Sequence, residues 1–268
     1  MKIFYQNYII WIQNLQEKYK MIIVGDIGNT DTKICLINSK KKILRKVSFN
    51  TKKINISLLN KSIKKLNFKF KNIEKCLFCS VVPKSYKLIE IYFNRFLKTK
   101  CYELKDLNLK KLINIKVNKK QIGSDRLSNA ISTINKKKNF IILDFGTATT
   151  FDVLIKNYYY GGIIAPGINI SLNTLIDRAT LIPKLNLKKM NKVIGSNTIN
   201  AVRSGFFWGY IGLIDKIVYL IKKETKKPFK LIITGGLAHL FKNSLTSSAT
   251  INKDITIKGL IKASDLIK

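Results

Sequence analysis

Two stretches of the sequence share one pattern: IIVGDIGNTDTK at residues 22–33 and IILDFGTATT at residues 141–150. Each starts with apolar residues typical of a buried strand, ends that strand in Asp-x-Gly, and continues through small hydroxyl or amide residues into a second strand. A third glycine turn, Gly235-Gly236, follows the apolar strand at residues 231–234. A repeat of this length indicates an α/β protein built from two duplicated domains.

The three glycine turns have the chemistry of phosphate-binding loops. We expect positive φ angles at Gly28 and Gly146, which would let backbone N–H groups and hydroxyls approach phosphate oxygens closely. Asp26 and Asp144 stand at strand ends, where a carboxylate organises a cation or a water beside those phosphates. One Asp-x-Gly turn is common in ordinary hairpins. Three glycine turns in this order resemble the two phosphate loops and the adenosine loop of the actin-like and sugar-kinase superfamily.

A second group of candidate residues is Gly123-Ser124-Asp125-Arg126, which precedes apolar residues at helical spacing. Asp125 is expected at the start of that helix, where a carboxylate can serve simply as an N-cap. In a phosphoryl-transfer site one carboxylate must orient the attacking hydroxyl and accept its proton, and Asp125 suits that role. Arg126 would hold an anionic acceptor through two parallel hydrogen bonds.

The charge balance raises a different hypothesis. Among 268 residues, 50 are Lys or Arg and 15 are Asp or Glu, so the net charge is +35 and the pI about 10.1. Such values are typical of nucleic-acid binders. However, only five of the basic residues are Arg, and the 43 Ile and 25 Asn indicate a bias toward A/T-rich codons. We therefore predict no specific nucleic-acid partner.

Other features bound the class of protein. We find no apolar run near the roughly 18 residues that a membrane span needs, so we predict no membrane association. The four cysteines show no disulfide spacing, which favours a reduced, cytoplasmic location, and Cys76 and Cys79 are expected in the core. We predict an N-terminal domain at residues 21–138 and a C-terminal domain at 139–268. Residues 1–20 would be an extension that precedes a true start at Met21, or else a short helix.

From Met21 onward the chain resembles the type III pantothenate kinase family. DIGNTDTK at residues 26–33 matches the family's first ATP loop, GSDR at 123–126 its substrate motif, and DFGTA at 144–148 its second phosphate loop. GGIIAPG at 161–167, IGSNT at 194–198 and ITGG at 233–236 match three further segments in the family's order. An aromatic residue that the family often carries shortly before the substrate motif is absent from residues 115–120.

The resemblance implies two ribonuclease-H-like (actin-like ATPase) domains with a nucleotide cleft between them, and transfer of the ATP γ-phosphoryl group to pantothenate. It implies Asp125 as the proton acceptor and Asp144 as the ligand of a monovalent cation, K⁺ or NH₄⁺. Magnesium would accompany the nucleotide, and the protein would be a homodimer. The residues implied to bind ATP are Asp26, Ile27, Gly28, Asn29, Thr30, Asp31, Thr32, Lys33 and Thr147; those implied to bind pantothenate are Gly123, Ser124, Asp125, Arg126 and Thr198.

Two alternatives remain open at this point. The first is another kinase of the same superfamily with a different small acceptor. The second is a catalytically inactive, basic regulatory or nucleic-acid-binding protein.

Overall fold

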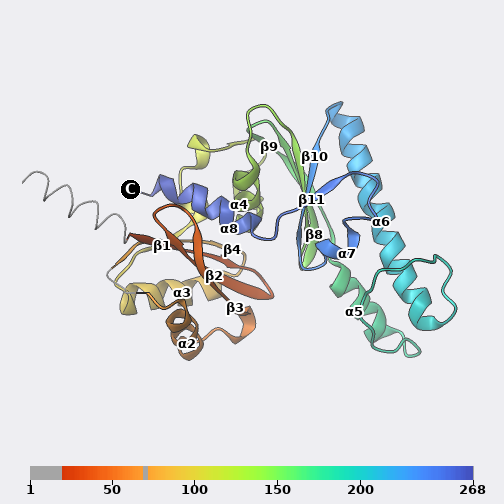
Figure 1. Ribbon diagram of the computed structural model, residues 1–268, viewed down its shortest axis with the longest axis horizontal. Coiled ribbons are helices and arrows are strands. Elements are labelled where there is room, and N and C mark those ends of the chain that lie inside the picture. Colours follow the sequence, from red (N-terminus) through yellow and green to blue (C-terminus); the bar gives the residue numbers. More distant parts are fainter. Residues whose placement is uncertain (1–19, 69–71, 268) are drawn as a thin grey trace, which may run out of the picture. The chain divides into compact units, whose positions relative to one another are not determined.

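The computed structural model describes residues 20–68 and 72–267 and divides them into two compact units (Figure 1). Within these residues, unit 1 comprises 20–112, 120–132 and 256–267, and unit 2 comprises 113–119 and 133–255. The prediction for residues 1–20 lies outside the described residues except at Lys20.

Unit 1 contains a five-stranded sheet in the order β3-β2-β1-β4-β5. The three strands β3, β2 and β1 are antiparallel neighbours, whereas β4 and β5 run parallel to β1. The strands are β1 (Met21–Ile27), β2 (Asp31–Asn38), β3 (Ile43–Asn50), β4 (Ile73–Ser80) and β5 (Cys101–Glu103).

Unit 2 repeats this arrangement. Its sheet has the order β11-β10-β7-β8-β9-β6, in which β9, β8 and β7 are antiparallel neighbours and β10 and β11 run parallel to β7. The short strand β6 is added beside β9. Because five strands have the same order and directions in both units, the predicted α/β duplication is confirmed. The strands are β6 (Asn114–Ile115), β7 (Phe140–Phe145), β8 (Ala148–Ile155), β9 (Tyr158–Pro166), β10 (Lys230–Gly235) and β11 (Ala249–Ile251).

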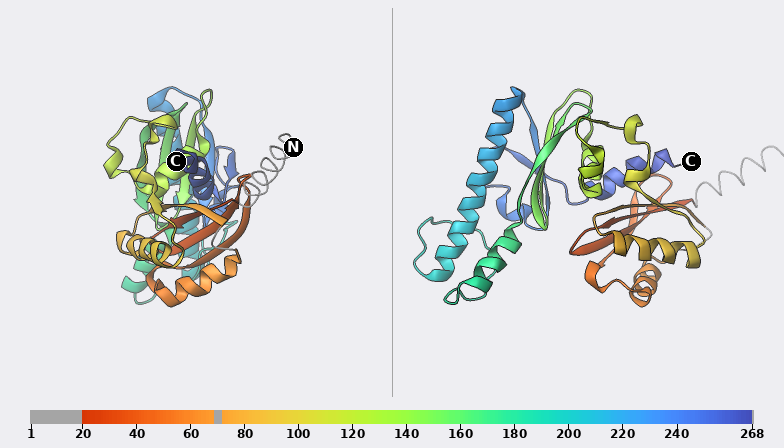
Figure 2. Two further views of the ribbon diagram at one scale, coloured as in Figure 1. Left: turned by 90° about the vertical axis from the view of Figure 1, so that its left-hand side faces the viewer. Right: turned by 180° about the vertical axis from the view of Figure 1, so that it is seen from behind.

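The central strands of the unit 1 sheet, β1, β2 and β4, are buried on both faces, whereas the edge strand β3 is largely exposed. Helices α2 (Ile56–Leu66) and α3 (Pro83–Phe96) pack on one face, where Ile23, Ile27 and Phe78 join their apolar residues in one core (Figures 1 and 2). Successive side chains of a strand point to opposite faces. Val24 and Asp26 of β1 therefore point to the other face, on the same side as α4 (Ser124–Thr133) and α8 (Ile255–Ala263).

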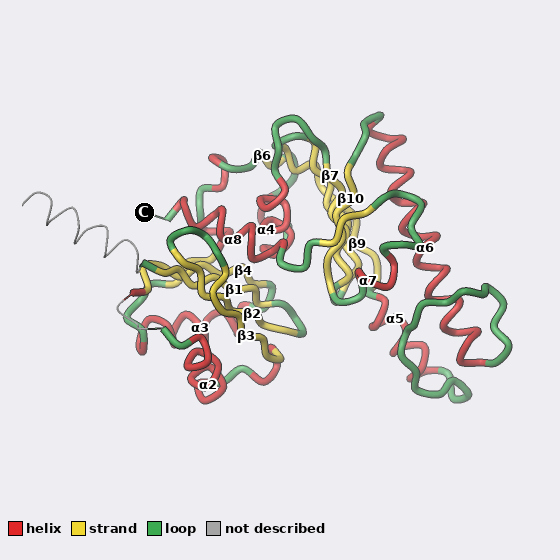
Figure 3. The backbone as a smooth tube through the Cα atoms, in the orientation of Figure 1, coloured by secondary structure: helices red, strands yellow, loops and turns green. Residues whose placement is uncertain are grey.

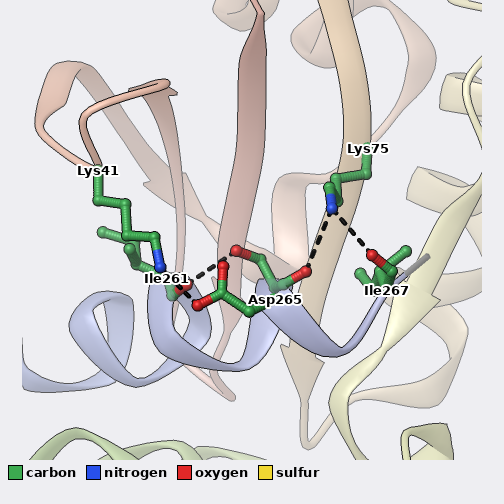
Figure 4. Close-up of polar contacts among 6 residues, drawn as sticks. Lys41, Lys75, Ile261, Asp265 and Ile267 are labelled. Atoms are coloured by element: carbon green, nitrogen blue, oxygen red, sulfur yellow. Dashed lines mark hydrogen bonds and ion pairs between the residues drawn. The ribbon is translucent and has the colours of Figure 1, made fainter.

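The end of the chain returns to unit 1, which differs from the predicted domain at residues 139–268. The backbone of Gly259 in α8 lies so close to Ser128 of α4 that an added Cβ would be 1.8 Å from the Ser128 carbonyl oxygen. After α8, a short 3₁₀ helix, η6 (Ser264–Leu266), is held by Lys75, whose Nζ donates to the carbonyl oxygens of Ser264 and Ile267 (Figure 4). The packing of α8 on α4 and the hydrogen bonds from Lys75 place the end of the chain in unit 1.

Unit 2 is built around α6 (Thr198–Thr225). Phe207, Ile211, Ile214, Val218 and Ile221 of this helix are buried in the core with residues of β7, β8 and β10. Phe206, Tyr210 and Ile217 of the same helix are only partly buried. Because α6 is apolar on more than one side, the spacing of its apolar residues alone does not select the packed face.

Helix α6 also bears on the membrane prediction. Among the described helices it is the one long and apolar enough to cross a membrane by length and composition, so the expectation that no stretch meets that criterion was wrong. The core helix of a globular protein passes the same test, and α6 supplies core residues of unit 2.

Two shorter helices and a long loop complete unit 2. These helices are α5 (Ile168–Arg178) and α7 (Ala238–Phe241). The loop at residues 179–197 joins α5 to α6 and is drawn in green in Figure 3.

Candidate active site

The first predicted phosphate loop is the hairpin between β1 and β2. Its tip is closed by a hydrogen bond from the Gly28 N–H to the Asp31 carbonyl oxygen, 3.0 Å long, and Asn29, Thr30 and Asp31 are exposed. Thr51, in the 3₁₀ helix η1 (Thr51–Lys53), braces this tip from behind. Its hydroxyl donates to the Gly28 carbonyl oxygen at 2.7 Å, and its N–H donates to the Thr30 carbonyl oxygen at 2.8 Å.

The expected positive φ angles at Gly28 and Gly146 were wrong. Among the described glycines, only Gly161 and Gly235 have positive φ. An added Cβ at Gly28 would lie 3.1 Å from the Asp31 carbonyl oxygen, a tight contact, whereas one at Gly146 would meet only ordinary contacts. Conformational freedom is needed in the third turn. There Gly235 has φ +88°, and an added Cβ would be 2.5 Å from the Phe145 carbonyl oxygen.

Asp26 lies near the end of β1 among polar groups of unit 1. Its neighbours across the sheet are Lys33 on β2 and Cys79 on β4, and the Cys79 thiol donates to Asp26 Oδ1 at 3.5 Å. Burial and the nearby carboxylate of Asp125 raise the pKa of Asp26 to about 6, although Lys33 and the thiol act in the opposite direction. The two carboxylates are therefore close neighbours.

Asp125 is the second residue of α4, inside the first turn of the helix and not before it. Its Oδ1 accepts a hydrogen bond of 2.8 Å from the N–H of Arg126, so the carboxylate does bind a backbone donor of the first helical turn. Gly123 makes room for this arrangement, because a Cβ there would lie 2.4 Å from Asp125 Oδ1. Burial raises the pKa of Asp125, while the Arg126 N–H and guanidinium lower it.

One carboxylate beside this cluster was not singled out from the sequence. Glu103, the last residue of β5, accepts hydrogen bonds from the Ser124 hydroxyl, from the N–H of Ser80 and from the N–H of Lys105. Burial of Glu103 raises its pKa. Glu103 lies in none of the sequence motifs, and only its position at the end of a short strand could have drawn attention to it. Thr51 also lies outside the motifs and was missed for that reason.

The second and third turns lie together in unit 2. Asp144 pairs across the sheet with Thr234 of β10 and with Thr150 of β8, and Thr147 is exposed at the tip of the β7–β8 hairpin. Gly167, from the predicted GGIIAPG segment, backs this tip: an added Cβ would be 2.0 Å from the Thr147 carbonyl oxygen. These three segments, far apart in the sequence, form one polar edge of the unit 2 sheet.

The remaining predicted residue, Thr198, is the first residue of α6 and is exposed. The side chain of Asn197 caps this helix by accepting from the Asn200 N–H. Gly195 lies against the first turn, since a Cβ there would be 2.2 Å from the Ala201 nitrogen.

The described residues contain no group of three or more His, Cys, Asp or Glu side chains that could hold a metal ion by themselves. Asp144 offers a partly buried carboxylate, and its register partners on the neighbouring strands, Thr150 and Thr234, both carry hydroxyl oxygens. Hard cations prefer oxygen ligands and commonly take several of them from substrate phosphates. The residues present therefore fit a cation that is completed by a bound nucleotide.

The duplicated sheet and its polar turns define the class of protein as an actin-like ATPase and sugar-kinase fold. A Sinorhizobium meliloti protein assigned as a 2-dehydro-3-deoxygalactonokinase superposes with a TM-score of 0.59 at 10% identity, covering 92% of this chain and 99% of that one. A Campylobacter jejuni protein assigned to the Baf family of transcriptional activators superposes with a TM-score of 0.57 at 19% identity, covering 91% and 97%. At these identities the similarity shows the fold alone.

The sequence comparisons identify the family. The family model described as type III pantothenate kinase matches residues 22–219. A type III pantothenate kinase of Pelagibacter ubique is 70% identical over 248 residues, which cover 92% of this chain and all of that protein. The chain therefore belongs to the type III pantothenate kinase family, as its motifs predicted.

Proposed function

We propose that this protein transfers the γ-phosphoryl group of ATP to the primary hydroxyl of pantothenate, giving 4′-phosphopantothenate in the first step of coenzyme A biosynthesis. The observation that carries the proposal is the match to a type III pantothenate kinase over the whole length of that relative. The geometry of unit 1 supports it, because GSDR stands at a helix start beside the aspartate of the first Asp-x-Gly turn.

Asp125 is the proton acceptor in this proposal. The carboxylate lies in the first turn of α4 and is close to Asp26, and burial raises its pKa. A carboxylate of raised pKa is a stronger base than an ordinary aspartate once it is ionised. Arg126, the next residue, would bind the carboxylate of pantothenate, because its planar guanidinium forms two parallel hydrogen bonds to such a group.

The nucleotide-binding residues in this proposal are Asp26–Lys33 and Thr147. The exposed tip at residues 29–31 and the exposed hydroxyl of Thr147 offer N–H and O–H donors for phosphate oxygens. Magnesium bound with the nucleotide would neutralise charge on the β- and γ-phosphates. The Asp26 carboxylate would organise a cation or a water beside the phosphates. Lys33 lies beside Asp26 on the neighbouring strand.

Pantothenate would be bound by Gly123–Arg126 and Thr198. A monovalent cation, K⁺ or NH₄⁺, would be held by Asp144. The carboxylate of Asp144 and the hydroxyl-bearing residues Thr150 and Thr234 paired with it support this assignment, since hard cations prefer oxygen ligands.

We also propose a cytoplasmic homodimer. Apolar side chains are strongly exposed on unit 2, including Ile164 at 66%, Leu181 at 91% and Ile194 at 89%, and a second copy of the chain would cover such residues. The four cysteines are buried and none of them forms a disulfide, which suits a reducing compartment. Specific binding to nucleic acid or membrane is no part of the proposal.

The test is ADP release by the purified protein with ATP and magnesium, with and without pantothenate, first in potassium and then in sodium buffer. We expect release that requires pantothenate and is faster in potassium. Release without pantothenate dependence, or only with another small acid or sugar, would support a different kinase of the superfamily. Binding of ATP without turnover on any acceptor would support a regulatory protein, which the curated relatives do not favour.

A further inference from the structure

Glu103 occupies a junction of three chain segments in unit 1. It is the last residue of β5, which runs parallel to β4, so the carboxyl ends of both strands meet at the same edge of the sheet. Ser80, at the end of β4, and Ser124, at the start of α4, both lie at this edge within hydrogen-bond distance of the Glu103 carboxylate.

The two carboxylate oxygens of Glu103 have different partners. Oε1 accepts from the Ser124 hydroxyl and from the Ser80 N–H, the latter at 3.3 Å. Oε2 accepts from the N–H of Lys105 at 2.5 Å. Hydrogen bonds to an ionised carboxylate are stronger than those between neutral groups, so these three contacts hold the carboxylate firmly between β4 and α4.

This junction bears directly on Asp125. Ser124 is 1% exposed, and the next residue in the helix is Asp125. A fixed Ser124 therefore fixes the position and rotation of the first turn of α4. The negative charge of Glu103 near this helix start also favours the helix, because free N–H groups give the start a partial positive charge.

We propose that Glu103 is a positioning residue that holds Asp125 in place through the Ser124 hydroxyl. The inference rests on the proposed function, in which Asp125 accepts the proton of the attacking hydroxyl. In this proposal Glu103 acts on Asp125 through Ser124 and takes no part in the proton transfer itself. Its contribution is to keep the reacting carboxylate in the orientation for reaction, where small misplacements cost large factors in rate.

The experiment compares the full-length wild type with Glu103→Gln, Ser124→Ala and the double variant. Glu74→Gln is the matched control, because Glu74 is an exposed glutamate of β4 in the same unit. For each protein, kcat and the KM for ATP are measured from pantothenate-dependent ADP release. Thermal unfolding and amide hydrogen exchange at the start of α4 are recorded in parallel.

We expect Glu103→Gln to lower kcat by about 10- to 100-fold and Ser124→Ala by about tenfold, with the KM for ATP within about twofold of wild type. The double variant should be no slower than Glu103→Gln alone, because both changes remove the same link. Exchange at the start of α4 should be faster in all three variants and unchanged in Glu74→Gln.

Three results would overturn the inference: an unchanged kcat in Glu103→Gln, losses that multiply in the double variant, or a fall in kcat that merely follows the fraction of unfolded protein. A wild type without pantothenate-dependent turnover would instead refute the proposed function. Hydrogen exchange would then decide the positioning role alone: faster exchange at the start of α4 in Glu103→Gln upholds it, and unchanged exchange refutes it.

Discussion

The carboxylates of Asp26 and Asp125 are neighbours in unit 1, although one belongs to strand β1 and the other to helix α4. Each is partly buried, and the charge of Asp125 helps to raise the pKa of Asp26 to about 6. Two like charges held close together cost folding free energy. Positive charge near the two carboxylates offsets this repulsion. The Lys33 side chain supplies such a charge, and a bound cation would supply another.

The first prediction concerns the pH dependence of stability. The pKa of Asp26 is about 6 in the folded protein, above the value of about 3.9 for an unfolded chain. Between about pH 4 and pH 6 the folded state retains a proton that the unfolded state has lost, so this residue makes stability fall as the pH rises through that window. Asp26→Asn should therefore be more stable than wild type at pH 8, by about 2–3 kcal/mol, and nearly equal to it at pH 4.

Urea unfolding of both proteins at the two pH values tests this expectation, with Asp31→Asn as the control because Asp31 is exposed at the tip of the same hairpin. Equal stabilities of wild type and Asp26→Asn at pH 8 would contradict it.

The second prediction separates the two roles open to Asp125. Asp125→Asn keeps an oxygen that can accept from the Arg126 N–H but removes the base. Turnover should fall by about 10²- to 10⁴-fold, while ATP binding, measured by calorimetry, stays nearly intact. Turnover close to wild type would show that Asp125 only caps the first turn of α4.

The third prediction concerns the cation proposed at Asp144. Asp144→Ala removes the carboxylate from the polar edge of the unit 2 sheet, and potassium should then no longer accelerate ADP release. Asp177→Ala is the control, because Asp177 is an exposed aspartate of α5 in the same unit. A potassium response that survives in Asp144→Ala would assign the cation to other residues.

The fourth prediction tests the close packing of α8 on α4. Gly259→Ala would place a methyl group 1.8 Å from the Ser128 carbonyl oxygen, so α8 must move away from α4. The hydrogen bond from the Ser128 hydroxyl to the Thr256 carbonyl oxygen, now 2.7 Å, would be strained or lost. We expect a loss of about 1–3 kcal/mol in the free energy of unfolding.

The matched control for this change is Gly212→Ala in α6, where an added Cβ meets nothing within 4 Å. It should leave stability unchanged or raise it by about 0.5–1 kcal/mol, because Ala is the better helix former. The free energies of unfolding of the two variants are measured by urea denaturation. Equal values would contradict the prediction, because they would show that α8 can move away from α4 without loss of stability.

The sequence predicted the repeated core well because its signals are local. Apolar runs that end in Asp-x-Gly at residues 22–28 and 141–146 define a buried strand and its turn without reference to the rest of the chain. The helix start at Gly123-Ser124-Asp125 was likewise visible, and the structure begins α4 at Ser124. The turn geometry was less predictable. Neither Gly28 nor Gly146 has a positive φ angle, and the two glycines differ in how closely an added Cβ would approach its neighbours.

By itself, then, the sequence determined the two strand–turn–strand repeats, the family motifs and the candidate residues within them, because each depends on neighbours along the chain. Only the tertiary structure decided which face of α6 is packed and that α8 belongs to unit 1. It also decided that Thr51 holds the turn at Gly28 and that Glu103 holds the first turn of α4, which carries Asp125. The physical reason is that these contacts join residues far apart in sequence. Burial and hydrogen bonding between such residues leave no periodic or local signal in the chain.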